Sequence, residues 1–152
     1  MTSLQTGATS KTLMIVEDEV LVAMELRDVL EEAGYHVLDL TERHAEAIEV
    51  AKKCKPNLAL VNIRLAGRDD GIELAEHLKA LDIPVVFISG QSSRAHSADT
   101  AAIASMPKPY DAADMVIAVA FLLGALDGDH TLPRPDGLEV FDHSGFNVAP
   151  AA

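Results

Sequence analysis

Side chains that could hold a metal ion and an anion follow four short apolar runs of this 152-residue sequence. They are Glu17 and Asp18 after residues 13–16, Asn62 after residues 58–61, Ser89 after residues 85–88, and Lys108 after residues 104–106. Two adjacent carboxylates with a further oxygen ligand suit a hard divalent ion such as Mg²⁺, which also keeps water and phosphate oxygens as ligands. An ammonium and a hydroxyl can bind oxygens of the same phosphoryl group. These residue types therefore predict a metal-assisted phosphoryl site, provided that the fold brings the four runs together.

The runs that carry these residues alternate with longer segments of helical period, which is typical of β-α units around a parallel sheet. Strands are expected at residues 13–16, 37–40, 58–61, 85–88 and 104–106, with helices at about 20–33, 42–54, 70–81 and 91–103 and from 112 onward. The fourth helix is poor in large apolar residues, so we expect it to be short and mobile. The predicted fold class is α/β, with a doubly wound five-stranded parallel sheet. Ligands of such sheets bind beyond the carboxyl ends of the strands, and in the strand order 2-1-3-4-5 the acidic pair and Asn62 would face each other.

Composition and charge argue against several classes of partner. Hydrophobic residues make up 49% and charged residues 24% of the chain, an ordinary balance for a globular domain. Twelve Lys and Arg against 24 Asp and Glu give a formal net charge of −12, which disfavours nucleic acid and anionic membranes as partners. The single cysteine, Cys54, cannot form an internal disulfide, the N-terminus lacks an apolar core of signal-peptide length, and the longest apolar run is too short to span a bilayer. We therefore expect a cytoplasmic protein.

Five short segments, in this order and at this spacing, make the chain resemble the response-regulator receiver domains of bacterial two-component signalling, including the chemotaxis type. The segments are Ile-Val-Glu-Asp-Glu at 15–19, Leu-Ala-Leu-Val-Asn-Ile-Arg-Leu at 58–65, Asp-Gly-Ile-Glu-Leu at 70–74, Phe-Ile-Ser-Gly at 87–90 and Pro-Lys-Pro-Tyr at 107–110. The resemblance covers residues 11–126 and implies a flavodoxin-like receiver fold that acts through protein-protein interaction. Residues 1–10 are then expected to be a disordered extension, and residues 127–152 an irregular tail without an output domain.

The resemblance also implies roles for individual residues and partners. It assigns Mg²⁺ to Glu17, Asp18, Asn62 and the backbone carbonyl of Arg64, and it places Ser89 and Lys108 around the phosphoryl group. It further implies a cis peptide between Lys108 and Pro109. The implied partner is a histidine kinase or a histidine phosphotransfer protein of a phosphorelay.

Asn62 stands where the family carries the aspartate that accepts the phosphoryl group. A carboxylate can attack phosphorus, whereas a neutral amide is a poor nucleophile, so we expect no phosphorylation at this position. The amide oxygen can still coordinate a cation, but the loss of one negative charge predicts weakened Mg²⁺ binding. Two origins stay open: a natural receiver that signals without phosphorylation, and an engineered substitution that locks the unmodified state. The intact remainder of the pocket favours the second.

The helix between Met115 and Leu126 is apolar on all sides, although a helix on one face of a sheet needs only one apolar stripe. A partner surface is the first explanation, and the resemblance suggests a homodimer there. The second explanation is that the tail folds back over the helix. Its apolar residues would supply the cover: Leu132, Leu138, Val140, Phe141, Phe146 and Val148.

The competing function is a small phosphatase on a similar α/β fold. Such an enzyme needs a nucleophilic aspartate and a second acid two residues later at the end of one strand. Neither Glu17-Asp18-Glu19 nor Asn62-Ile63-Arg64 provides that pair. The sequence therefore favours a signalling domain over an enzyme.

Overall fold

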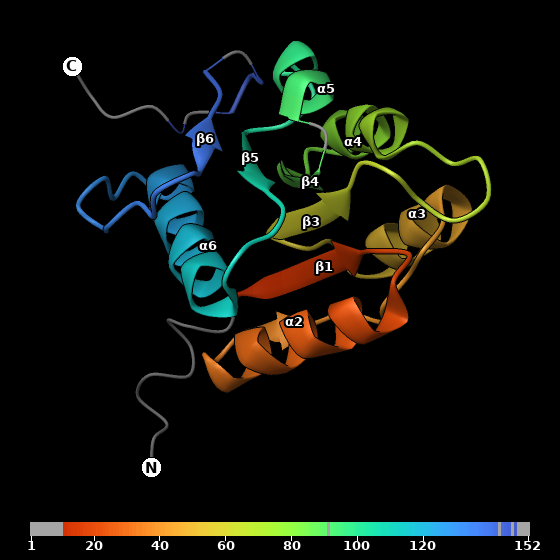
Figure 1. The fold of residues 1–152 in the computed structure, drawn as a ribbon, viewed down its shortest axis with the longest axis horizontal. Coiled ribbons are helices and arrows are strands. Elements are labelled where there is room, and N and C mark those ends of the chain that lie inside the picture. The colour runs from red at the N-terminus through yellow and green to blue at the C-terminus, as the bar shows by residue number, and fades with distance from the viewer. Residues whose placement is uncertain (1–10, 91, 143, 147, 149–152) are drawn as a thin grey trace.

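The computed structural model describes residues 11–90, 92–142, 144–146 and 148 (Figure 1). The predicted disordered extension at residues 1–10 lies outside the described residues, as do residues 91, 143, 147 and 149–152. None of the helices in the described part of the chain combines the length and the apolar character needed to cross a membrane.

The observed strands and helices alternate as the sequence predicts. The strands are β1 (Thr12–Val16), β2 (His36–Val37), β3 (Leu58–Asn62), β4 (Val85–Ser89), β5 (Ala104–Pro107) and β6 (Glu139–Val140). The helices are α2 (Val20–Glu32), α3 (His44–Lys53), α4 (Gly71–Ala80), α5 (Ser92–Ser97) and α6 (Ala112–Leu126). The sheet order is β2-β1-β3-β4-β5-β6, with all neighbours parallel except β5 and β6. The predicted α/β class and the parallel order 2-1-3-4-5 are confirmed.

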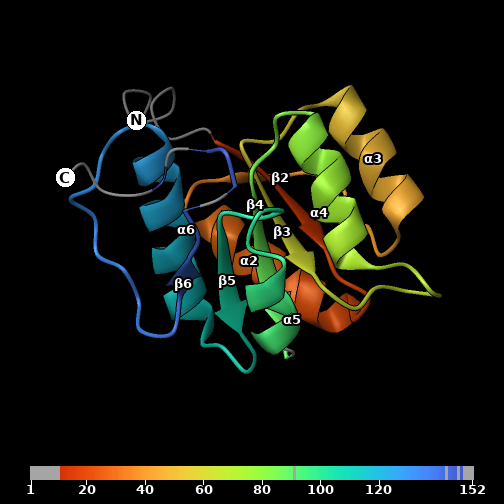
Figure 2. The ribbon, with the colours of Figure 1, turned by 90° about the horizontal axis from the view of Figure 1, so that it is seen from above.

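The sheet separates two apolar clusters because successive residues of a strand point to opposite faces. Leu13 and Ile15 of β1 pack in the cluster that contains residues of α2 and α6. Met14 and Val16 pack in the cluster that contains residues of α3 and α4. Figure 2 shows these two pairs of helices on opposite sides of the sheet. The two covered faces explain why the strands are continuous apolar runs rather than alternating ones.

Helix boundaries follow local signals in the sequence. The side chain of Asp70 caps α4 by accepting from the backbone N–H of Ile72 at 2.9 Å, and Asp111 caps α6 by accepting from Ala113 at 2.9 Å. Gly34 follows α2 with a φ of 106°, a left-handed conformation that favours glycine after a helix. Two side-chain caps and one glycine conformation therefore account for these helix ends.

A sixth, antiparallel strand extends the sheet beyond the five strands that were predicted. Residues Glu139 and Val140 pair antiparallel with Ser105 and Ala104 of β5. The backbone N–H of Phe141 then donates to the carbonyl of Ile103 at 2.8 Å. A two-residue strand has no side-chain period that a sequence could reveal, so only the pairing with β5 defines it.

The tail also covers α6. Leu138 and Val148 of the tail are 3% and 1% exposed, and both belong to the apolar cluster that contains Met115, Val119 and other residues of α6. This corresponds to the second explanation of the apolar helix, except that Phe141 packs on the opposite face of the sheet, in the cluster that contains residues of α3 and α4. A second copy of the chain is therefore not needed to account for most of that surface, although Ile117 remains 37% exposed.

Candidate functional site

One pocket lies where the parallel strands end. Its volume is about 320 Å³, and its lining residues are Asp18, Glu19, Asn62, Ile63, Arg64, Ser89, Gly90 and Lys108. The strand register brings these residues to one edge of the sheet, because β1 pairs with β3, β3 with β4, and β4 with β5 in parallel. The structure therefore places five residues named from the sequence on this pocket: Asp18, Asn62, Arg64, Ser89 and Lys108.

Glu17 lies behind the pocket wall rather than on it. It is 2% exposed, and its carboxylate accepts the backbone N–H of Glu19 at 3.1 Å. Its other oxygen accepts from Nζ of Lys108 at 3.3 Å. Burial raises the pKa of Glu17 and the hydrogen bond with Asp18 adds to this, while the Glu19 N–H and Lys108 oppose the rise. Glu17 therefore positions Lys108 in addition to being a candidate metal ligand.

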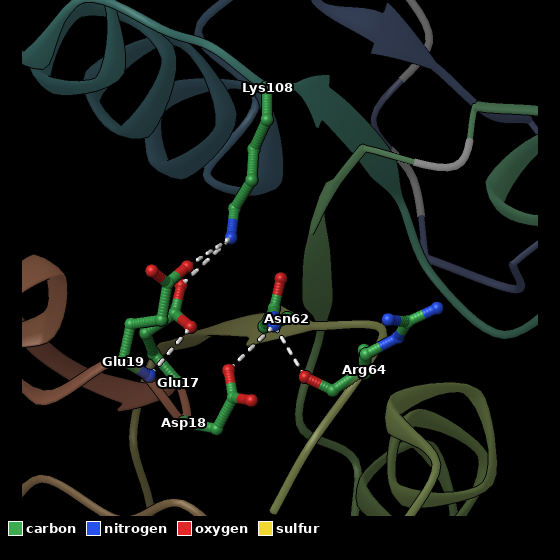
Figure 3. A network of polar contacts seen from close by, with 6 residues as sticks. All are labelled: Glu17, Asp18, Glu19, Asn62, Arg64 and Lys108. Atoms are coloured by element: carbon green, nitrogen blue, oxygen red, sulfur yellow. Dashed lines mark hydrogen bonds and ion pairs between the residues drawn. The ribbon is translucent and has the colours of Figure 1, made fainter.

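Glu19 is the site residue that sequence reasoning left out. Its carboxylate lies 3.6 Å from Nζ of Lys108, so Lys108 is held between Glu17 and Glu19 (Figure 3). The available signal was its adjacency to Glu17 and Asp18, but a third exposed acid at the start of a helix is ordinary in solvated turns. The peptide between Lys108 and Pro109 is cis, as the resemblance implies.

Asn62 connects the acidic loop to the loop after β3. Its Nδ2 donates to Oδ1 of Asp18 at 3.2 Å and also to the backbone carbonyl of Arg64. Figure 3 shows the amide oxygen directed away from both acceptors. Asn62 is 6% exposed, so these hydrogen bonds are largely shielded from water.

The donor atoms around this loop fit a hard divalent ion chemically. Among the described residues, the carboxylates of Glu17, Asp18 and Glu19 offer oxygen atoms that all lie within 4.8 Å of one another. Oxygen-only ligand sets of this kind suit Mg²⁺. The carbonyl of Arg64 lies across Asn62 from the acidic residues, and Figure 3 shows it turned toward Asn62.

The start of α4 holds the Arg64 loop against the pocket. The backbone N–H of Gly71 donates to the carbonyl of Ile63 at 2.7 Å. Asp70, which caps the helix, also accepts from Nη2 of Arg94 at 2.8 Å, so the loop after β3 is tied to α5. The sequence marked Asp70 and Gly71 as a helix start, but the close packing of Gly71 on β3 is visible only in the structure.

Tyr110 lies next to the site and gives a testable pH dependence. Burial, followed by the negative charges of Glu17, Glu25 and Glu19, raises the pKa of Tyr110 to about 12. An unfolded tyrosine titrates near pH 10. The stabilising contribution of the neutral phenol is therefore fully present below about pH 10 and is lost as the pH rises through about 12. Absorbance titration of the phenolate should show a late transition in the parent protein that Tyr110→Phe removes, leaving only Tyr35. Equal alkaline titration in both proteins would contradict this assignment.

Comparisons with known proteins agree on one family. The profile of the response regulator receiver domain matches residues 13–120. The chain is 31% identical over 117 residues to the transcriptional regulatory protein PdtaR of Mycobacterium tuberculosis, a match that covers 74% of this chain and 57% of PdtaR. It is 34% identical over 84 residues to the phyllosphere-induced regulator PhyR of Methylorubrum extorquens, which covers 54% of this chain and 32% of PhyR. The chain thus spans little more than half of the first relative and about a third of the second.

The structural comparison gives the same result. The REC domain of the PhyR response regulator from Erythrobacter litoralis superposes with a TM-score of 0.67 at 27% sequence identity, over 75% of this chain and 90% of that one. PdtaR and the two PhyR proteins are named as regulators.

Proposed function

This chain belongs to the response regulator receiver domain family, and we propose that it works in two-component signalling as an interaction module that is not phosphorylated at its strand-end site. The observation that carries the proposal is Asn62 at the end of β3, inside the pocket formed by Asp18, Ser89 and Lys108. A carboxylate at that place could attack phosphorus and form an acyl phosphate, whereas the nitrogen lone pair of a carboxamide is delocalised and its oxygen is a weak nucleophile.

The residues around Asn62 include oxygen ligands for a metal ion and an ammonium, the groups that bind a phosphoryl group. Mg²⁺, when bound, would neutralise the charge of phosphate oxygens, and Glu17, Asp18, Glu19 and the Arg64 carbonyl are the oxygens that would hold it. The ammonium of Lys108 can bind phosphate oxygens. In the structure it forms ion pairs with Glu17 and Glu19. The pocket therefore combines binding groups with a position that lacks a nucleophile.

A protein partner is part of the proposal, and α2 supplies the exposed surface that supports it. Val20 and Leu21 are 55% and 80% exposed at the start of the helix, beside the acidic loop, and Met24 is 38% exposed one turn later. Apolar side chains at the rim of a polar pocket are typical of protein contact surfaces. We propose a histidine kinase or histidine phosphotransfer protein of the cytoplasm as the partner of this surface.

The decisive experiment restores the carboxylate. The parent protein and Asn62→Asp are incubated with a small phosphoryl donor and Mg²⁺, and the intact mass of each is measured. We expect one added phosphoryl group on Asn62→Asp, dependent on Mg²⁺, and none on the parent, because only the variant has a nucleophile in the pocket.

Asn57→Asp is the matched control for this experiment. Asn57 stands at the other end of β3, where its Oδ1 accepts the backbone N–H of Thr12 at 2.8 Å, an interaction that a carboxylate can keep. The control adds the same charge immediately before β3, away from the pocket, and should not be labelled. A phosphoryl group added to the parent protein would contradict the proposed function. Absence of labelling on Asn62→Asp would show that the pocket itself does not work as a phosphoryl site.

A further inference from the structure

Two oxygens that a metal ion at this edge of the sheet would use are already engaged by Asn62. Its Nδ2 donates one hydrogen to Oδ1 of Asp18 at 3.2 Å and the other to the carbonyl of Arg64. The two acceptors come from different loops, one after β1 and one after β3. A single NH₂ group therefore bridges the two loops (Figure 3).

The orientation of the amide follows from the chemistry of its neighbours. An ionised carboxylate and a backbone carbonyl are acceptors only, so only the NH₂ side of the carboxamide can face both. Turning the amide over would bring its oxygen against the two oxygens of Asp18 and Arg64 with no proton between them. Only a bound cation could hold three oxygens together in that way. In the observed orientation no cation is needed, because the partially positive NH₂ group lies between the Asp18 and Arg64 oxygens.

The other acids of the loop are also satisfied without an ion. Glu17 accepts from Lys108 and from the backbone N–H of Glu19, and the Glu19 carboxylate lies 3.6 Å from Nζ of Lys108. With Asp18 held by Asn62, each of the three carboxylates has a donor or a cation from the chain itself. The cluster therefore has no structural requirement for a metal.

We propose that the Asn62 carboxamide takes the place of a metal ion in this pocket. Its two N–H groups hold the Asp18 carboxylate and the Arg64 carbonyl together, and Mg²⁺ can enter only by displacing them. The proposal rests on the proposed function in one respect, the assignment of these oxygens to the metal site. It goes further in stating that Asn62 is a competitor of the ion rather than a ligand, so that the pocket is assembled whether or not Mg²⁺ is present.

Mg²⁺ titrations of the full chain test this proposal. Backbone amide signals of residues 17–19 and 64 report binding in the parent, Asn62→Ala, Asn62→Asp and Asn57→Asp, at constant ionic strength and after each variant has been shown to be folded. Asn62→Ala removes the competing NH₂ group without adding charge, so it should bind Mg²⁺ at least as tightly as the parent. Asn62→Asp replaces the donors with a carboxylate and should bind about tenfold more tightly or better, because ligand charge raises affinity for the ion. Asn57→Asp should bind as the parent does.

Thermal unfolding gives a second readout. The unfolding temperature of the parent should rise less between EDTA and Mg²⁺ than that of Asn62→Asp, because Mg²⁺ must displace the amide to bind the parent. Asn62→Asp should unfold at a lower temperature than the parent in EDTA, since it places a fourth carboxylate beside three others, and should recover when Mg²⁺ is added.

The outcomes separate the possible failures. If Asn62→Ala binds Mg²⁺ more weakly than the parent while Asn62→Asp binds it more tightly, the amide oxygen is a ligand and the proposal is overturned. If Asn62→Asp does not bind Mg²⁺ either, the assignment of the metal site is wrong and the proposal falls with it. The proposed function fails by a different result, the uptake of a phosphoryl group by the parent protein.

Discussion

Replacing Gly71 with alanine is expected to lower the free energy of unfolding by about 3 kcal/mol, because a side chain at this position collides with backbone atoms. A Cβ at Gly71 would lie 2.1 Å from the carbonyl oxygen of Asn62 and 2.8 Å from Cα of Ile63. Backbone atoms of a central strand cannot turn aside as a flexible side chain can. The start of α4 must therefore move away from β3, which weakens the hydrogen bond from Gly71 to Ile63 and displaces Asn62. Urea unfolding of parent and variant measures the loss.

Gly90→Ala is the control for this prediction. Gly90 also lines the pocket, yet a Cβ there would meet nothing within 4 Å. Its replacement should change stability by about 0.5 kcal/mol or less, as for ordinary surface substitutions. Equal losses of stability in Gly71→Ala and Gly90→Ala would show that Gly71 is not needed for the close packing of α4 on β3. We also expect Gly71→Ala, but not Gly90→Ala, to shift the side-chain amide signals of Asn62.

Removing residues 128–152 should destabilise the protein strongly and make it self-associate. Leu138, Phe141 and Val148 of the tail are 3%, 4% and 1% exposed, and burial of each such side chain contributes about 1.5–3 kcal/mol. The expected loss of about 5 kcal/mol is comparable to the whole stability of many domains. Truncation also uncovers the edge of β5 and the apolar surface of α6, both of which favour association with a second copy. Light scattering after size exclusion, together with urea unfolding, measures both effects.

Single substitutions test whether the buried side chains of the tail, rather than the presence of the tail as such, stabilise the protein. Phe141→Ala should cost about 3–5 kcal/mol because it empties a buried site on the α4 side of the sheet. Leu132→Ala changes a side chain that is 36% exposed and should cost much less. A truncated chain that stays monomeric with unchanged stability would show that the tail does not stabilise the sheet or cover α6.

Much of the fold was predictable because it depends on local patterns. Apolar runs of strand length and the helical periods between them indicated five β-α units in the observed order. The strand β2 is shorter than predicted, His36–Val37 instead of 37–40, since only Thr12 and Leu13 of β1 pair with it in the ladder. The tail strand β6 was not predicted, because two residues are too few to show a period.

The order of residue types along the chain was enough to identify which side chains meet at the pocket. Asp18, Asn62, Ser89 and Lys108 each follow an apolar strand closely, and parallel strands place such residues at one edge regardless of the details of packing. The pairing of these side chains, in contrast, depends on the three-dimensional arrangement. The hydrogen bond from Asn62 to Asp18 joins residues 44 positions apart, and the clash that excludes a side chain at Gly71 depends on the approach of α4 to β3. Such contacts arise from the relative placement of whole elements, which local patterns of residue type do not encode.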